Sequence, residues 1–185
     1  NGMQEQAVGF IETCSIAAGI AAADACLKRA EVQLLEARPI CPGKFMVLFR
    51  GEMSQVQNAL GAGCDVAADA LVDKLFLPRI HSSVFTALSL TGQPVKGEAL
   101  GIIETVTAAV CIVASDAAAK AAEVNLLELR LADGLGGKSF VLMEGSVADV
   151  EAGVAAGAAK VTAEGLLVRK VVISHLHPAV REKIL

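Results

Sequence analysis

Cysteine thiols are the side chains in this sequence whose chemistry is easiest to anticipate. There are five, at positions 14, 26, 41, 64 and 111, and no two of them form a C-x-x-C pair. An odd number at these spacings, with no secretory leader ahead of them, is typical of free thiols in a reducing cytosol. Four of them lie at apolar positions in or beside helical stretches, where small buried thiols are expected: Cys14, Cys26, Cys64 and Cys111.

Cys41 differs from the others because a turn composition, Ile40-Cys41-Pro42-Gly43-Lys44, surrounds it. A thiolate is a ligand for soft metals and for iron–sulfur clusters. Such clusters usually take four thiolates from closely spaced cysteines of one chain, and a lone cysteine cannot supply them. From the residues alone, a ligand and an inert thiol both stay open.

Histidines and glutamates offer weaker candidates. His175-x-His177 lies at a strand end without a third ligand nearby. We therefore expect His175 and His177, and His81 as well, to be polar residues at an edge and not metal ligands. Glu12 and Glu104 follow the first strand of each half of the chain. Identical positions in two halves favour a structural contact over acid–base catalysis.

Known catalytic and phosphate-binding patterns do not fit this sequence. Gly134-x-Gly136-Gly137 follows a strand and precedes a strand, whereas a loop that holds phosphate opens a helix. No Ser/His/Asp or Cys/His nucleophile arrangement is apparent, so we do not expect an enzyme.

Composition argues against nucleic acid and membranes as partners. The 185 residues carry a net charge of −4 and contain no Trp or Tyr, so both a basic surface and stacking platforms are missing. Mean hydropathy is +0.57. The two most apolar stretches, 14–27 and 106–119, each contain an Asp and are shorter than the roughly 20 residues that span a bilayer. Alanine-rich buried helices and extensive subunit contacts explain the hydropathy instead.

An internal repeat determines the architecture. Ala7–Thr13 (AVGFIET) returns as Ala99–Thr105 (ALGIIET), and Ala30–Glu36 (AEVQLLE) returns as Ala122–Glu128 (AEVNLLE). The offset between the copies is about 92 residues, with about two extra residues in one loop of the second copy. We predict two domains, at 7–90 and 99–185, joined by a turn-rich linker at 91–98.

Each copy predicts the order β-α-β-β-α-β, a ferredoxin-like split β-α-β unit in an α+β fold. Ser15 is a suitable N-cap for the first helix. The expected elements of the first copy are strands at Val8–Thr13, Val32–Ala37, Phe45–Phe49 and Leu71–Leu77, helices at Ile16–Arg29 and Glu52–Cys64, and a short helix from near His81.

Three segments together resemble the bacterial microcompartment shell domain: Ala7–Thr13, Asp24-Ala25-x-x-Lys28 and Leu77-Pro78-Arg79-Ile80-His81. The resemblance extends from about residue 7 to 177, and the strand-first order matches the unpermuted arrangement of the family. Two copies in one chain resemble its tandem form, whose trimers are pseudohexameric tiles. The resemblance therefore implies a homotrimer in the shell of a cytoplasmic microcompartment, with lateral contacts to other hexagonal shell proteins.

The turn at Ile40–Lys44 lies where this family places its pore loop. With Gly134-Leu135-Gly136-Gly137-Lys138 in the second copy, it resembles the iron–sulfur-carrying tandem shell trimers of propanediol-utilisation compartments. The resemblance implies one [4Fe–4S] cluster per trimer, held at the central pore by Cys41 of each subunit. The three-fold symmetry would bring three cysteines together, as close spacing along one chain usually does. The implied pore-lining residues are Ile40, Pro42, Gly43, Lys44, Gly134, Leu135 and Gly136.

The implied function is a facet tile that passes electrons across the shell or delivers its cluster. Its partner would be an encapsulated redox enzyme or an external electron donor. Three thiolates would also suit zinc, so the ligand is better defined than the metal. By the same resemblance Lys28, Lys120 and Arg79 contact neighbouring tiles, although His175 replaces the arginine in the second copy.

Two alternatives stay open. One is a purely structural tile whose pore conducts small metabolites without a cluster. The other is a trimeric ferredoxin-like signalling protein that binds a nucleotide between subunits, which leaves the residues of the tile edge unexplained.

Overall fold

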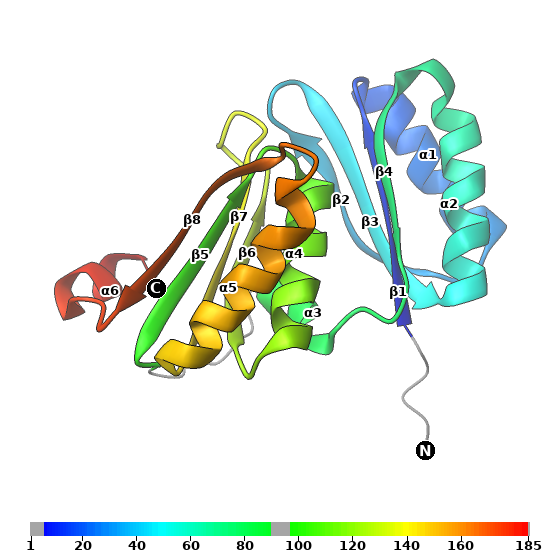
Figure 1. The fold of residues 1–185 in the computed structure, drawn as a ribbon. Helices are drawn as coiled ribbons and strands as arrows, with labels where there is room; N and C mark the ends of the chain where they lie inside the picture. The colour runs from blue at the N-terminus through cyan, green and yellow to red at the C-terminus, as the bar shows by residue number, and fades with distance from the viewer. Residues whose placement is uncertain (1–5, 90–96, 185) are drawn as a thin grey trace. The chain divides into compact units, whose positions relative to one another are not determined.

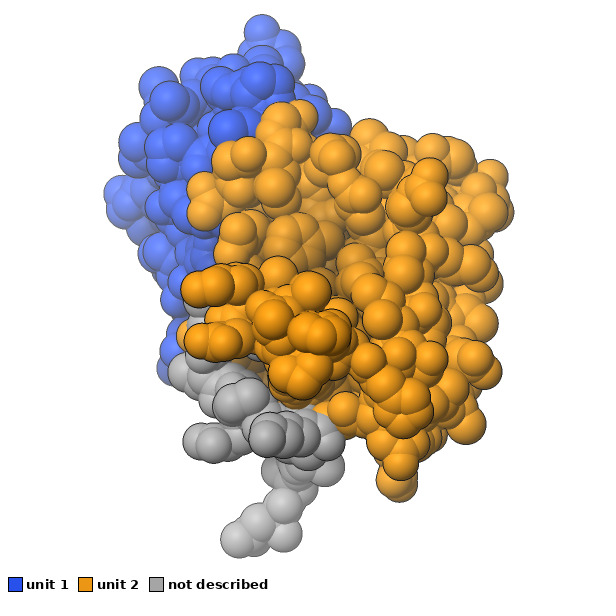
Figure 2. Space-filling view, turned by 90° about the vertical axis from the view of Figure 1, so that its left-hand side faces the viewer, with its two compact units in different colours: residues 1–80 blue, residues 81–185 orange. Residues whose placement is uncertain are grey.

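The computed structural model of the protein describes residues 6–89 and 97–184. The chain forms two compact units, residues 1–80 and 81–185, which Figure 2 shows in different colours. The predicted linker at 91–98 falls largely on residues 90–96, outside the described residues.

The first unit contains a four-stranded antiparallel sheet in the order β2-β3-β1-β4 (Figure 1). Two helices pack against each other and against this sheet. Its elements are β1 (Gln6–Thr13), α1 (Ile16–Arg29), β2 (Gln33–Ile40), β3 (Lys44–Glu52), α2 (Met53–Ala67), a short 3₁₀ turn (Ala68–Ala70) and β4 (Leu71–Leu77).

The second unit repeats this arrangement with sheet order β6-β7-β5-β8, so the predicted tandem α+β fold is confirmed. The short helix α3, which follows the first repeat in the sequence, belongs to this unit and packs on it. The elements are α3 (Ser82–Leu88), β5 (Ala99–Thr105), α4 (Ala108–Ala121), β6 (Asn125–Leu131), β7 (Ser139–Gly145), α5 (Val147–Thr162), β8 (Leu167–Ser174) and α6 (Pro178–Ile184).

Helix starts are fixed by short polar side chains. The Ser15 hydroxyl accepts a hydrogen bond from the backbone N–H of Ala18 at 3.3 Å, which confirms the predicted N-cap. Thr107 caps α4 in the same manner through the N–H of Val110. None of the helices in the described parts of the chain is long and apolar enough to cross a membrane.

Small residues let the paired helices approach closely. A Cβ atom added at Gly63 of α2 would overlap Cys26 Sγ of α1 and lie 2.5 Å from Ile11 Cδ1 of β1. At Gly157 of α5, a Cβ atom would lie 2.6 Å from the carbonyl oxygen of Ala114 in α4. The alanine-rich helices of both units therefore pack at a distance that only glycine permits at these points.

Some element boundaries differ from the prediction. Helix α2 continues to Ala67, and strands β2 and β3 extend until only residues 41–43 remain in the turn. Pairing of Ile40 with Lys44 closes the hairpin. The strand accommodates Pro39 because β2 is at the edge of the sheet, where a missing N–H costs little.

Candidate pore-loop site

Cys41 lies at the tip of the β2–β3 hairpin, where its side chain is half-buried. Ile40, the last residue of β2, is buried, and Pro42 follows Cys41 through a cis peptide bond. Gly43 has φ +66°, a left-handed conformation that favours glycine, and an added Cβ would meet no atom within 4 Å. The turn is therefore tight, and one face of it is open.

An ion pair ties this hairpin to the centre of its sheet. Lys44 Nζ, at the start of β3, contacts the Glu12 carboxylate of β1, and the Glu12 side chain is only 2% exposed. In the second unit Lys138 Nζ lies 2.5 Å from Glu104, with side chains 49% and 31% exposed. Both glutamates therefore make the structural contact expected of them, and the one beneath Cys41 is the more buried.

The matching loop between β6 and β7 has a different chemistry. It contains no thiol, and Gly134, Gly136 and Gly137 have positive φ values of 68°, 63° and 95°. The N–H of Lys138 donates to the carbonyl of Leu135 at 3.2 Å. This loop is therefore rich in glycine and has no thiol, whereas a thiol lies at the tip of the other loop.

The remaining cysteines differ from one another in exposure. Burial raises the pKa of Cys26 to about 11 and that of Cys111 to about 12. Burial also raises the pKa of the half-buried Cys64. The expectation of a buried thiol is wrong for Cys14, which is exposed because it lies in the turn between β1 and α1.

A single chain does not assemble a metal site in the parts that the structure describes. There, no three His, Cys, Asp or Glu side chains lie together in a group that could hold an ion. Cys41 can contribute one thiolate only, so a cluster fits this donor set if several subunits each bring a copy of the hairpin.

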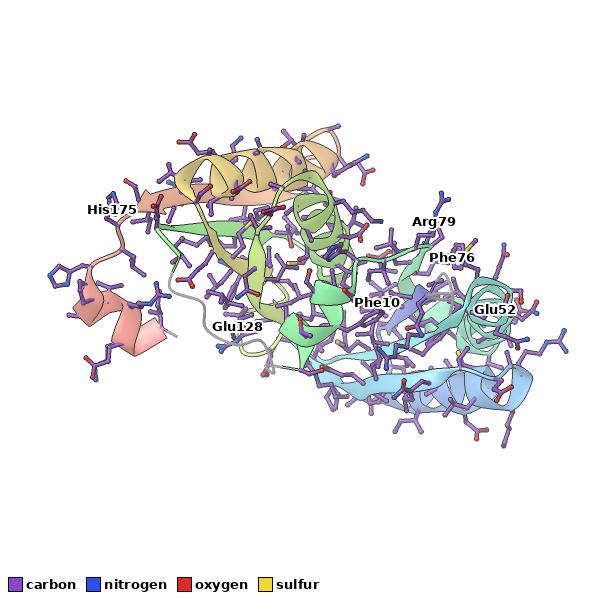
Figure 3. All side chains as sticks on the ribbon, turned by 90° about the horizontal axis from the view of Figure 1, so that it is seen from below. Phe10, Glu52, Phe76, Arg79, Glu128 and His175 are labelled. Atoms are coloured by element: carbon purple, nitrogen blue, oxygen red, sulfur yellow. The ribbon has the colours of Figure 1, made fainter. Side chains whose placement is uncertain are left out.

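The residues expected at the tile edge are accessible. Lys28 pairs with Asp24, and Lys120 pairs with Asp116, each at 2.6 Å. Arg79 is exposed, and its side chain extends away from the ribbon in Figure 3.

Arg79 and His175, which occupy matching positions after β4 and β8, share an unusual backbone conformation. Their φ values are 51° and 53°, in the left-handed region that few residues other than glycine adopt. The chain therefore makes the same sharp turn at the end of both sheets, with an arginine at one and a histidine at the other.

Two histidines that sequence reasoning assigned to an edge are helix caps. His81 Nδ1 accepts from the N–H of Ser83 at 3.3 Å, at the start of α3. His177 Nδ1 accepts from the N–H of Ala179 at 3.2 Å, at the start of α6. The signal was available in the sequence, because each histidine precedes a short helical segment by one residue.

The chain belongs to the bacterial microcompartment shell family, because the model of the BMC domain matches residues 7–80 and again residues 99–176. It is 44% identical to the bacterial microcompartment shell protein PduT of Citrobacter freundii, over 93% of this chain and 94% of that protein. It is 41% identical to the major carboxysome shell protein CsoS1A of Halothiobacillus neapolitanus over 47% of this chain and 92% of that protein.

Solved structures agree with this assignment. A crystal structure of a microcompartment protein from Desulfitobacterium hafniense superimposes with a TM-score of 0.93 and 47% identity, covering 96% of this chain and 98% of that one. The protein is therefore a shell protein with two BMC domains in tandem.

Proposed function

We propose that three copies of this shell protein form a tile that holds a [4Fe–4S] cluster at its centre, with Cys41 of each subunit as a ligand. The observation that carries the proposal is the position of this thiol. Cys41 is half-buried at the tip of a tight hairpin, and the matching loop of the second unit has no thiol. A ring of three chains would therefore alternate loops that can ligate with loops that cannot.

The protein's own residues would position the thiolates. The Lys44–Glu12 ion pair fixes the base of the hairpin, and the left-handed turn at Gly43 keeps the tip free of side-chain bulk. A Cys41 held on this short turn loses little conformational entropy when it ligates. A bound cluster would supply one-electron chemistry, and three protein ligands would leave one iron open.

Lysines and an arginine would join tiles laterally to other hexagonal shell proteins. Lys120 remains 44% exposed although its partner Asp116 is only 7% exposed, so the ammonium group is available to a neighbour. Lys28 is 75% exposed. Arg79 adds a cation at the end of β4, and His175 at the end of β8 does not reproduce it.

A cluster at the centre of a tile would serve electron transfer across the shell or delivery of the cluster to a partner. The partner would be an encapsulated redox enzyme or an external electron donor. These partners are inferred from the chemistry of the group.

Iron and acid-labile sulfide assays on protein purified without oxygen test the proposal. We expect about four irons and four sulfides per trimer, an EPR signal after reduction, and loss of both in Cys41→Ser with the trimer intact. Cys14→Ser is the matched control, because it removes an exposed thiol outside the hairpin and should leave the iron content unchanged.

A folded, reconstituted trimer that contains no iron would contradict the proposal of a bound cluster. The function would then be the second candidate, a structural tile whose pore conducts small metabolites. The loop at 132–138 favours that candidate, because three of its seven residues are glycines and none of them offers a thiol to a metal. Zinc in place of iron would retain Cys41 as the ligand and overturn the redox function.

A further inference from the structure

Glu12 carries a carboxylate that is almost completely buried. It lies in β1 directly after Ile11, and its side chain is 2% exposed. Ile11 faces α2, because a Cβ atom added at Gly63 would lie 2.5 Å from Ile11 Cδ1. Side chains alternate along a strand, so Glu12 lies on the opposite face of the sheet. A buried carboxylate costs free energy unless a cation compensates it, and here the cation is Lys44.

Lys44 lies on that same face, at the base of the Cys41 hairpin. Phe45, the next residue of β3, faces α1, since a Cβ atom added at Gly19 would lie 2.5 Å from Phe45 Cδ1. Lys44 therefore points away from α1, and its Nζ contacts the buried carboxylate on the other face. Ile40 pairs with Lys44 across the hairpin, and Cys41 is the residue after Ile40. The ion pair is thus at the base of the turn that carries the thiol.

Other charges around this pair are more exposed. Asp73 of β4 is opposite Glu12 in the sheet and is partly exposed. In the second unit, the side chains of the matching pair Lys138 and Glu104 are 49% and 31% exposed. Water and salt screen exposed charges more strongly than buried ones. The field of the Lys44–Glu12 pair is therefore screened less than that of the matching pair.

We propose that the Lys44–Glu12 pair sets the reduction potential of the cluster that Cys41 ligates. Glu12 is a positioning residue, because its carboxylate holds the Lys44 ammonium at the base of the hairpin. Reduction adds one negative charge to a cluster whose thiolate ligands are already negative, and a nearby cation favours it. Lys44 therefore raises the potential, whereas the Glu12 carboxylate itself lowers it. The proposal rests on the cluster of the proposed function.

Removal of each charge should shift the potential in opposite directions. The test is an EPR-monitored titration with dithionite, read at the midpoint potential of the wild type. Lys44→Met should lower the ratio of reduced to oxidised cluster about ten-fold, which is about 59 mV for a one-electron couple. Glu12→Gln should raise that ratio, because glutamine removes the anion and still offers Lys44 an oxygen acceptor. Disturbed packing of the hairpin would not produce shifts of opposite sign.

A second comparison isolates the same charge without leaving a carboxylate buried beside no cation. The double variant Glu12→Gln/Lys44→Met removes both charges, and its ratio of reduced to oxidised cluster should be about ten-fold below that of Glu12→Gln. Lys44→Arg keeps the cation and should retain the wild-type potential. Lys138→Met is the matched control, because it breaks the more exposed pair and should shift the potential less than Lys44→Met does.

Three results would overturn the proposal: the same potential in Glu12→Gln and in the double variant, shifts of the same sign in both single variants, or a larger shift in Lys138→Met than in Lys44→Met. Each of them leaves the cluster of the proposed function in place, since the wild type still contains iron. A wild type that binds no iron would overturn both proposals together.

Discussion

The backbone N–H of His81 donates a hydrogen bond to Asp116 at 2.7 Å, whereas Asp24, the same residue of the first repeat, keeps its carboxylate exposed beside Lys28. The repeat thus places one aspartate in two environments within one chain. In the second unit it is buried and fixes the start of a helix, and in the first it is exposed and pairs with Lys28.

Substitution of the two aspartates should therefore have different consequences. Asp116→Ala removes a buried carboxylate that accepts from the His81 N–H and pairs with Lys120, and it should lower the free energy of unfolding by about 1–3 kcal/mol. Asp24→Ala removes an exposed pair with Lys28 and should change it by less than about 0.5 kcal/mol. Urea titrations measure both. Equal destabilisation by the two variants would contradict the difference in environment.

The ion pair beneath the Cys41 hairpin should matter more than its counterpart. Lys44→Met leaves the Glu12 carboxylate buried without its cation, and we expect a loss of roughly 3 kcal/mol in the free energy of unfolding. Lys138→Met breaks a more exposed pair with Glu104 and should cost less than about 1 kcal/mol. Chemical denaturation measures the loss in the free energy of unfolding of both variants. A larger loss in Lys138→Met would show that burial of the ion pair does not control its contribution to stability.

Two glycines of α2 should respond in opposite directions to alanine. A Cβ at Gly63 would overlap Cys26 and Ile11, so Gly63→Ala should destabilise the protein by about 1–3 kcal/mol. A Cβ at Gly61 meets nothing within 4 Å, so Gly61→Ala should stabilise it by up to about 1 kcal/mol through helix propensity. Thermal melts of both variants measure the difference. Destabilisation by Gly61→Ala would mean that this position is covered in the assembled protein.

Stability should fall above pH 9 because two thiols are buried. The pKa of Cys111 rises from 9.0 to about 12 and that of Cys26 to about 11, so both thiols keep their protons in the folded state after the unfolded chain has lost them. The contribution of the two thiols to the free energy of unfolding is therefore fully present below pH 9. Above pH 9 this free energy decreases by about 1.4 kcal/mol per pH unit for each thiol, until the pH reaches the pKa of that thiol in the folded state. Urea titrations from pH 8 to 11 measure the slope. The slope should be smaller in Cys111→Ala, and the same slope in that variant would contradict the prediction.

Much of the fold follows from the sequence because the repeat duplicates its signals. The Ser15 cap, the glycine-rich turn after β6 and the order of elements are local properties, and each was predicted. The ends of the strands were not predicted. The pairing of Ile40 with Lys44, for example, depends on how β2 and β3 pair with each other in the sheet.

The contacts that hold helix α3 and the Cys41 hairpin in place were also not predictable from the sequence. His81 and Asp116 are 35 residues apart, and Lys44 and Glu12 are 32 apart, so only the folded chain brings them together. The exposure of Cys14 was missed because its apolar neighbours resembled a buried helix, whereas it lies in the turn before α1.

Native mass spectrometry of mixed trimers tests the central claim most directly. Wild-type and Cys41→Ser chains, distinguished by isotopic labelling, would be mixed, reconstituted with iron and sulfide without oxygen, and sprayed intact. We predict that the mass of one [4Fe–4S] cluster is found on trimers with three Cys41 thiols and is lost from trimers in which all three subunits carry the Cys41→Ser substitution. Cluster mass on single chains, or on trimers built only of the Cys41→Ser variant, would contradict a site shared by three subunits.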